Sequence, residues 1–206
     1  MMAVSLELPH LIYPGAALDD LEILERAPAE LAAALRVRNG SIGYLGALHV
    51  RGACHAPAWH SLRHAWEGPD ALHELFEDVR PADVPFAEDA FGDQFLLRDG
   101  RVLRLNGELG EVSAVAESLG SFVASLWSDA EQVLDYQPLL TFRQSGAELR
   151  PGELLAAHPP FALQADHSTR ELRTVDALER RRQLAGLARR LRGLPDGAEV
   201  RFPAGE

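Results

Sequence analysis

The feature that most constrains the fold is a pair of short apolar runs, FLLR and RVLRL, separated by Asp99-Gly100. A two-residue Asp-Gly break between such runs predicts a β-hairpin, because the tight primed turn needs positive φ at both central positions. The turn also fixes the register of the two strands. The expected partners are Arg98 with Arg101, Leu97 with Val102, Leu96 with Leu103, and Phe95 with Arg104.

This register places apolar side chains on both faces of the hairpin. One face carries Leu96, Leu103 and Leu105, and the other carries Phe95, Leu97 and Val102. Helices or loops should therefore cover much of both faces. Asn106-Gly107 begins a second turn, and residues 112–116 (VSAVA) form the expected third strand of an antiparallel meander.

The predicted helices lie before and after this meander. They span residues 18–27, 29–38, 69–78, 119–134 and 176–192, with Ser118 as one cap and Asp176 with Glu179 as an acidic capping box. Short strands are expected at ALHV (47–50) and AEVRF (198–202), and residues 53–68 are expected to be irregular. Segregated strands and helices favour an α+β fold over a doubly wound sheet.

The fold class predicted is thus α+β, with an antiparallel or mixed sheet around a central meander, helices packed around it and a C-terminal helical extension. The 206 residues are expected to form one domain, with a core of about 18–134 and an extension of about 135–206. No apolar run approaches the roughly 20 residues that span a bilayer, and the first ten residues do not resemble a secretory signal. A soluble, cytoplasmic protein is expected.

Composition excludes several kinds of chemistry. All 20 basic residues are arginine, so Schiff bases and phosphate loops that need lysine are excluded. The single cysteine, Cys54, cannot form an internal disulfide. The net charge of −11 disfavours nucleic acid and anionic membranes as partners and would attract a basic protein, although solubility alone also explains it.

Five acids lie within or beside the breaks of residues 86–112: Glu88, Asp89, Asp93, Glu108 and Glu111. They lack the ligand spacing of an EF-hand calcium loop. Because Asp is common in turns for backbone reasons, we interpret these acids as residues that decorate the turns of a sheet. If they have a further role, we expect it to be recognition.

A histidine-rich segment offers the alternative of a metal or catalytic site. His60 and His64 are four residues apart and would share a helix face, with His55 nearby, but the glutamate of an HExxH motif is missing. Cys54 beside His55 is only a sequence neighbour, and there is no G-x-S-x-G motif. We therefore expect no metal, no cofactor and no catalytic residues.

Two further features have both a functional and a structural reading. Trp59 and Trp66 are either interface anchors or core residues. The arginine-rich helix at 176–192 could bind phosphates or an acidic partner, but arginine stems also cover apolar surface.

The order of these signals resembles the SUKH superfamily, which includes fungal cell-wall-synthesis regulators and many bacterial toxin-immunity proteins. The resemblance spans about residues 20–127. It rests on an aromatic-Ala-x-Asp phrase followed by Gly-Asp and an aromatic residue, and on a later Gly-Glu-Val phrase. The matching residues are Phe86, Ala87, Asp89, Gly92, Asp93, Phe95, Gly110, Glu111 and Val112.

The resemblance implies an α+β fold and a protein-binding role without catalysis, most often as a bacterial immunity protein that neutralises a cognate toxin by direct binding. An acidic surface suits a basic toxin, through electrostatic steering and aromatic anchors. The contacts expected are Glu88, Asp89, Asp93, Trp59 and Trp66. A regulatory or scaffolding module for an endogenous protein remains the alternative, and the sequence does not define the oligomeric state.

Overall fold

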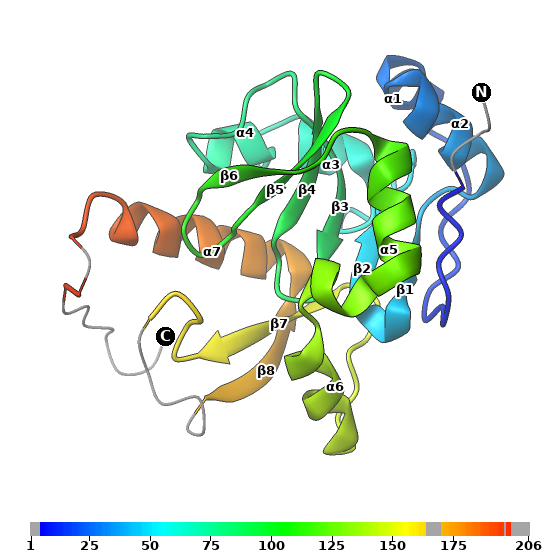
Figure 1. The fold of residues 1–206 in the computed structure, drawn as a ribbon. Coiled ribbons are helices and arrows are strands. Elements are labelled where there is room, and N and C mark those ends of the chain that lie inside the picture. The colour runs from blue at the N-terminus through cyan, green and yellow to red at the C-terminus, as the bar shows by residue number, and fades with distance from the viewer. Residues whose placement is uncertain (1–4, 164–169, 196, 199–206) are drawn as a thin grey trace.

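The main sheet is a single antiparallel meander. The structure is a computed structural model, and it describes residues 5–163, 170–195 and 197–198 (Figure 1). Each strand pairs with its neighbours in sequence, which gives the order β1-β2-β3-β4-β5-β6. The α+β prediction is therefore confirmed. The strands are β1 (Ser41–Gly43), β2 (Leu48–Val50), β3 (Val84–Asp89), β4 (Gln94–Arg98), β5 (Arg101–Leu105) and β6 (Val112–Ala116).

The hairpin at the centre of the sheet forms as predicted. Asp99 has φ 52° and Gly100 has φ 81°, so both central residues take the left-handed conformation of a primed turn. All four predicted pairs of β4 and β5 are present, with one more pair between Gln94 and Leu105. The predicted third strand is β6, which pairs with β5.

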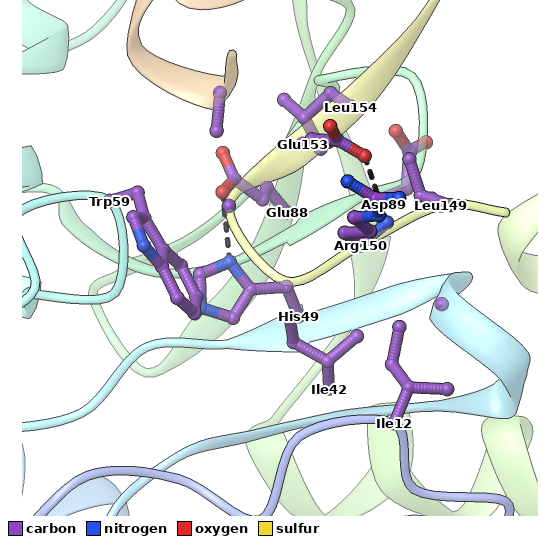
Figure 2. A pocket seen from close by; sticks show the side chains of 13 residues that line it. Ile12, Ile42, His49, Trp59, Glu88, Asp89, Leu149, Arg150, Glu153 and Leu154 are labelled. Atoms are coloured by element: carbon purple, nitrogen blue, oxygen red, sulfur yellow. Dashed lines mark hydrogen bonds and ion pairs between the residues drawn. The ribbon is translucent and has the colours of Figure 1, made fainter. Parts of the chain in front are cut away.

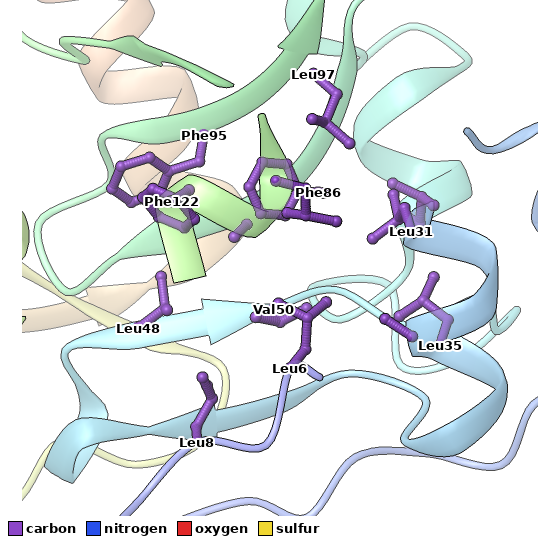
Figure 3. Packing of buried hydrophobic residues seen from close by; sticks show 14 of the residues in the cluster. Leu6, Leu8, Leu31, Leu35, Leu48, Val50, Phe86, Phe95, Leu97 and Phe122 are labelled. Atoms are coloured by element: carbon purple, nitrogen blue, oxygen red, sulfur yellow. The ribbon is translucent and has the colours of Figure 1, made fainter. Parts of the chain in front are cut away.

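The two faces of the sheet pack against different helices, as the hairpin register requires. On one face, Phe86 and Phe95 contact Phe122 of α5 (Leu119–Leu134), with ring centroids 5.8 and 4.9 Å from that of Phe122 (Figure 3). The helices α1 (Leu21–Arg26) and α2 (Ala29–Val37) contribute to the same core. On the other face, Leu96 and Leu103 pack with residues of α4 (Leu72–Leu75) and α7 (Ala177–Leu191).

Capping side chains account for where α1, α5 and α7 begin. The side chain of Asp20 accepts a hydrogen bond from Ile23 N, so α1 begins at Leu21, three residues later than expected. Ser118 and Ser121 form a capping box at α5, and Asp176 caps α7 by accepting from Leu178 N and Glu179 N. Within the described ranges, no helix has both the length and the apolar character needed to cross a membrane.

Two local predictions between β2 and β3 are wrong. The segment 53–68 is not wholly irregular, because Ser61 caps the short helix α3 (Leu62–Trp66). The helix expected at 69–78 is a single turn, α4, which begins at Leu72 after Ala71, a residue with no capping side chain. A short 3-10 helix, η1 (Tyr44–Gly46), connects β1 to β2.

The extension after residue 134 contains the predicted C-terminal helix, α7, and elements that were not predicted. These are α6 (Gln137–Gln144) and a two-stranded sheet of β7 (Glu153–His158) and β8 (Glu171–Asp176). Leu155 N donates to Ala90 O at 2.7 Å, which joins β7 to the end of β3. The strand predicted at 198–202 lies outside the described residues except for its first residue.

Candidate functional site

The acids predicted as partner contacts lie around the end of β3. Glu88 and Asp89 are the last two residues of this strand, with relative exposures of 0% and 1%. The interpretation that they decorate a turn is therefore wrong for Glu88, whereas Asp89 is the strand residue that directly precedes the β3–β4 turn. Asp93 does lie in the β3–β4 turn, but it is also buried.

The carboxylate of Asp89 organises that turn. Its Oδ1 accepts hydrogen bonds from Phe91 N, Gly92 N and Asp93 N at 2.9, 2.9 and 3.0 Å. Gly92 has φ 99°, a conformation that glycine adopts without strain. Backbone geometry thus explains the Asp89, Gly92 and Asp93 positions of the sequence phrase.

One guanidinium group holds Asp89 and Asp93 together. Arg104 donates from Nη2 to Asp89 Oδ2 at 3.0 Å and from Nε to Asp93 Oδ2 at 2.8 Å. Gly107 N donates to the other oxygen of Asp93 at 2.8 Å. Burial and the neighbouring charge of Asp93 raise the pKa of Asp89 to about 7, although Arg104 opposes the shift.

Asp89 and Asp93 also line an open pocket of about 320 Å³, which we call the Asp89–Asp93 pocket. Two further carboxylates, Glu108 and Asp135, lie in its wall. Phe161 and Leu109 give it apolar side chains that are 38% and 37% exposed. The full lining is Asp89, Phe91, Asp93, Arg104, Asn106, Glu108, Leu109, Asp135, Pro138, Phe161 and Ala162.

Glu88 belongs to a different cluster, the Glu88 network, formed with Arg51, His49, His60 and Gln94. Its Oε2 accepts from Arg51 Nη2 at 2.6 Å and from Gln94 Nε2 at 3.0 Å. Arg181 Nη2 lies 3.5 Å from the same oxygen. Although burial opposes it, the charge of Arg51 and the hydrogen bond from His49 hold the pKa of Glu88 well below its usual range.

Two histidines extend the Glu88 network toward α2. His49 Nδ1 lies 2.9 Å from Glu88 Oε1 (Figure 2). His49 Nε2 lies 2.8 Å from His60 Nδ1, and His60 Nε2 lies 3.1 Å from Asn39 O. Both ring nitrogens of each histidine are therefore engaged within the protein, and neither ring is positioned as a free base for a substrate.

The two tryptophans predicted as anchors have different environments. Trp59 is half-buried, and its ring centroid lies 5.1 Å from that of Tyr13 and 5.3 Å from that of His49. It also borders a small void beside Glu88 (Figure 2). Trp66 is buried, and its Nε1 donates to Pro81 O at 3.0 Å. The tryptophan with most exposed surface is Trp127 on α5, at 61%, which the sequence did not single out.

The other candidate residues are not brought together. His60 precedes α3, whereas His64 lies within it and approaches Asp70, so these two histidines do not share a helix face. His55 is exposed, 3.6 Å from Asp20. Among the described residues, no three His, Cys, Asp or Glu side chains are placed to hold a metal ion. Burial and the nearby Asp19 raise the pKa of the Cys54 thiol to about 11, which disfavours the reactive thiolate.

The structure thus defines an α+β protein with a closed buried network on one side of the end of β3 and an open acidic pocket on the other. No protein-family model matches the sequence, and a search of curated proteins finds no similar sequence. The SUKH resemblance therefore stays a prediction. Of the five predicted contacts, Asp89 and Asp93 line the open pocket, while Glu88, Trp59 and Trp66 do not.

Proposed function

We propose that this chain is a non-enzymatic protein-binding domain, an immunity protein that neutralises a cognate basic toxin by direct binding. The observation that carries this proposal is the Asp89–Asp93 pocket, which is open, acidic and edged by apolar side chains. We assign to it the role of receiving a cationic side chain of the partner.

The charges of the pocket favour a cation. Four carboxylates line it, from Asp89, Asp93, Glu108 and Asp135. The guanidinium groups that contact them belong to Arg104, which bridges the first two, and Arg180, whose Nη2 is 3.5 Å from Glu108 Oε1. A third guanidinium, of Arg170, lies 4.9 Å from the ring centroid of Phe161 in the pocket wall. The four carboxylates outnumber these three groups, so an incoming positive charge would improve the local balance.

The apolar side chains favour a cation carried on a long side chain. Phe91 and Phe161 meet edge to face, with ring centroids 5.3 Å apart, and Leu109 adds an aliphatic surface. The methylene stem of an arginine or lysine can pack on such a surface while its charged end reaches the carboxylates. Four acids in one pocket would also increase the rate of association with a basic protein by steering.

The functional groups elsewhere support binding over catalysis. The two buried histidines use all four ring nitrogens in hydrogen-bonding contacts within the chain. The one thiol is buried, and its pKa is raised. The choice of a bacterial toxin as the partner, and of the cytoplasm as the location, rests on the resemblance to the SUKH superfamily.

The test begins with the genes beside the one that encodes this protein. A basic protein encoded there is prepared as an inactive variant, and its binding is measured. Calorimetry and stopped-flow association should be recorded at low and moderate salt. We expect a one-to-one complex whose association rate falls as salt rises, because exposed charges are screened. No complex, or an association rate that ignores salt, would contradict the proposal.

Two matched variants separate the pocket from the general acidity of the chain. Asp135→Asn removes one pocket charge, and Asn suits the left-handed backbone that Asp135 adopts at φ 48°. Glu25→Gln removes one exposed charge from α1. We expect Asp135→Asn to weaken binding about tenfold, or about 1.4 kcal/mol, and Glu25→Gln to change it less than about twofold. Equal effects would contradict the assignment of the pocket.

A further inference from the structure

His60, His49 and Glu88 form a chain of three close contacts that ends in an acceptor at both sides. At one end, the carbonyl oxygen of Asn39 lies 3.1 Å from His60 Nε2. At the other, a carboxylate oxygen of Glu88 lies 2.9 Å from His49 Nδ1. Between them, the two rings meet at 2.8 Å. A carbonyl and an ionised carboxylate can only accept, so the nitrogen at each end of the chain must donate.

Counting protons shows that two neutral imidazole rings cannot make all three contacts into hydrogen bonds. Each of the three contacts needs one hydrogen to be a hydrogen bond. A neutral imidazole carries one ring hydrogen, so His49 and His60 together supply two. In the neutral chain, one contact would bring two lone pairs together, at a distance that is favourable only with a proton between the atoms.

We propose that the contacts from Glu88 through His49 to His60 form a buried proton-binding site. In this site, His49 takes up a third proton at a ring nitrogen and becomes an imidazolium between Glu88 and a neutral His60. The proton is transferred from a hydronium ion of the solvent, so one O–H bond breaks as one N–H bond forms, water is left, and no group is oxidised or reduced. The positive ring then donates to Glu88 through Nδ1 and to His60 through Nε2, and His60 donates to Asn39 O.

His49 is the better seat for the proton because it faces the carboxylate. Glu88 favours the imidazolium through both its charge and its hydrogen bond. Burial, and then the charge of His49, lower the pKa of His60 to about 3. His60 therefore stays neutral with its hydrogen on Nε2.

The groups packed around His49 oppose one another, which makes the proton removable. Burial is the largest effect and, with Arg51 beyond β2 and Arg181 of α7, it holds the pKa of His49 below its ordinary value, while Glu88 of β3 opposes this shift. The neighbouring His60, Trp59 and Tyr13 rings and the amide of Gln94 complete the surroundings, and Arg150 and Glu153 border the adjacent void. Without the third proton, one contact is lost and the histidine rings can turn.

A small void lies beside His49 and Glu88. The void, of about 10 Å³, is bordered by His49, Glu88, Trp59 and Gly152 (Figure 2). This volume is close to what one water needs, and the two ionisable side chains give that water polar partners. Trp59 packs on both histidine rings, with centroids 5.3 and 5.5 Å away, so its environment should change with the state of the chain.

The test is a ¹⁵N NMR titration of the histidine side chains in the full chain, from about pH 4 to pH 8.5, a range that covers the ordinary histidine pKa and extends well below it, because burial lowers the pKa of His49. We expect His49 to carry hydrogens on both ring nitrogens at the acid end and to lose one in a single step. His60 should keep its Nε2 hydrogen throughout. Two neutral rings at every pH at which the protein is folded would overturn the proposal, as would a step that belongs to His60.

Two variants identify the cause of the step. Glu88→Gln removes the carboxylate, and we expect the midpoint of the His49 step to fall by at least about one pH unit, or the step to vanish. His64→Gln changes a residue of α3 that takes no part in these three contacts, so the midpoint of the His49 step should not move. If Glu88→Gln does not fold, the titration of the unaltered protein still decides the question. An unchanged step in a folded Glu88→Gln protein would contradict the assignment.

Discussion

Glu88 and Asp89 are neighbours in β3, both are almost completely buried, and yet their carboxylates have opposite properties. Successive side chains of a strand point to opposite faces, so the two groups enter different environments. Glu88 meets Arg51, Arg181 and His49, and its pKa is lowered. Asp89 shares Arg104 with a second carboxylate, and its pKa is raised to about 7.

The difference shows that burial alone does not determine the role of an acid. Burial raises the pKa of both groups, and the number of cations around each decides the net shift. At Glu88, that number exceeds the number of carboxylates, and the network is closed. At Asp89, the ratio is reversed, and a pocket of about 320 Å³ opens beside it. Glu88 is thus suited to stabilising the folded state, and Asp89 is suited to binding a cation.

The largest expected effect comes from removing the carboxylate of the Glu88 network. Glu88→Ala leaves the guanidinium of Arg51 buried with no charged partner, and we expect the free energy of unfolding to fall by about 3–5 kcal/mol. Equilibrium urea denaturation measures the change. A loss below about 1 kcal/mol would show that the network is not essential to the fold and would remove the contrast with Asp89.

A second prediction concerns the pH dependence due to Asp89. Its pKa is higher in the folded protein, at about 7, than the ordinary value of 3.8, so the folded state binds more protons between these limits. Stability should therefore fall as pH rises from about 4 to 7, by about 1.4 kcal/mol for each unit by which the pKa is raised. Asp89→Asn keeps an oxygen for the three backbone donors and should flatten this slope.

Urea denaturation of the unaltered protein and of Asp89→Asn at several pH values provides the measurement. Asp99→Asn, in the exposed turn between β4 and β5, is the matched control and should leave the slope unchanged. Parallel slopes for the unaltered protein and Asp89→Asn would mean that Asp89 titrates in its ordinary range.

A smaller effect is expected where Leu184 of α7 packs against Gly107 and Gly92. A Cβ atom on Gly107 would lie 2.8 Å from Leu184 Cδ1 and 3.2 Å from Gly92 O. Gly107→Ala should therefore lower the free energy of unfolding by about 1–3 kcal/mol through overpacking. The effect should shrink in a Leu184→Val background, where the δ-methyl groups are absent. Additive losses in the double variant would contradict this cause.

The regions that the sequence could predict are those where short-range chemistry decides the structure. The β4–β5 register follows from Asp99-Gly100, and α5 and α7 follow from the caps at Ser118 and Asp176. Strand β3 was missed because all six of its residues are buried, so no alternation is visible, and because Pro85 normally argues against an inner strand. The register of β3 against β4 shifts between Pro85 and Ala87, which is where a strand can accommodate proline.

The candidate site was predictable only in part, because only some of its residues are close to one another in the sequence. Asp89 and Asp93 belong to one turn, and the sequence phrase around them drew attention to both. Phe161 and Asp135 join them from segments more than 40 positions away, through the docking of the C-terminal extension. The partners of Glu88 come likewise from separate segments: His49 and Arg51 lie at β2, and Arg181 on α7. No spacing in the sequence indicates such contacts.

The most direct test of the central claim is a ¹H–¹⁵N NMR titration of the full chain with a tri-arginine peptide, against tri-glutamate, at pH 6 and pH 8. We expect saturable shifts confined to the backbone amides around the Asp89–Asp93 pocket, such as Gly92, Gly107 and Leu109. Binding should be tighter at pH 8, because a cation favours the ionised form of Asp89. Shifts spread over the other exposed acids, such as Glu22, Glu25 and Glu30 of α1 and α2, or no saturable shift at either pH, would contradict a binding role for this pocket.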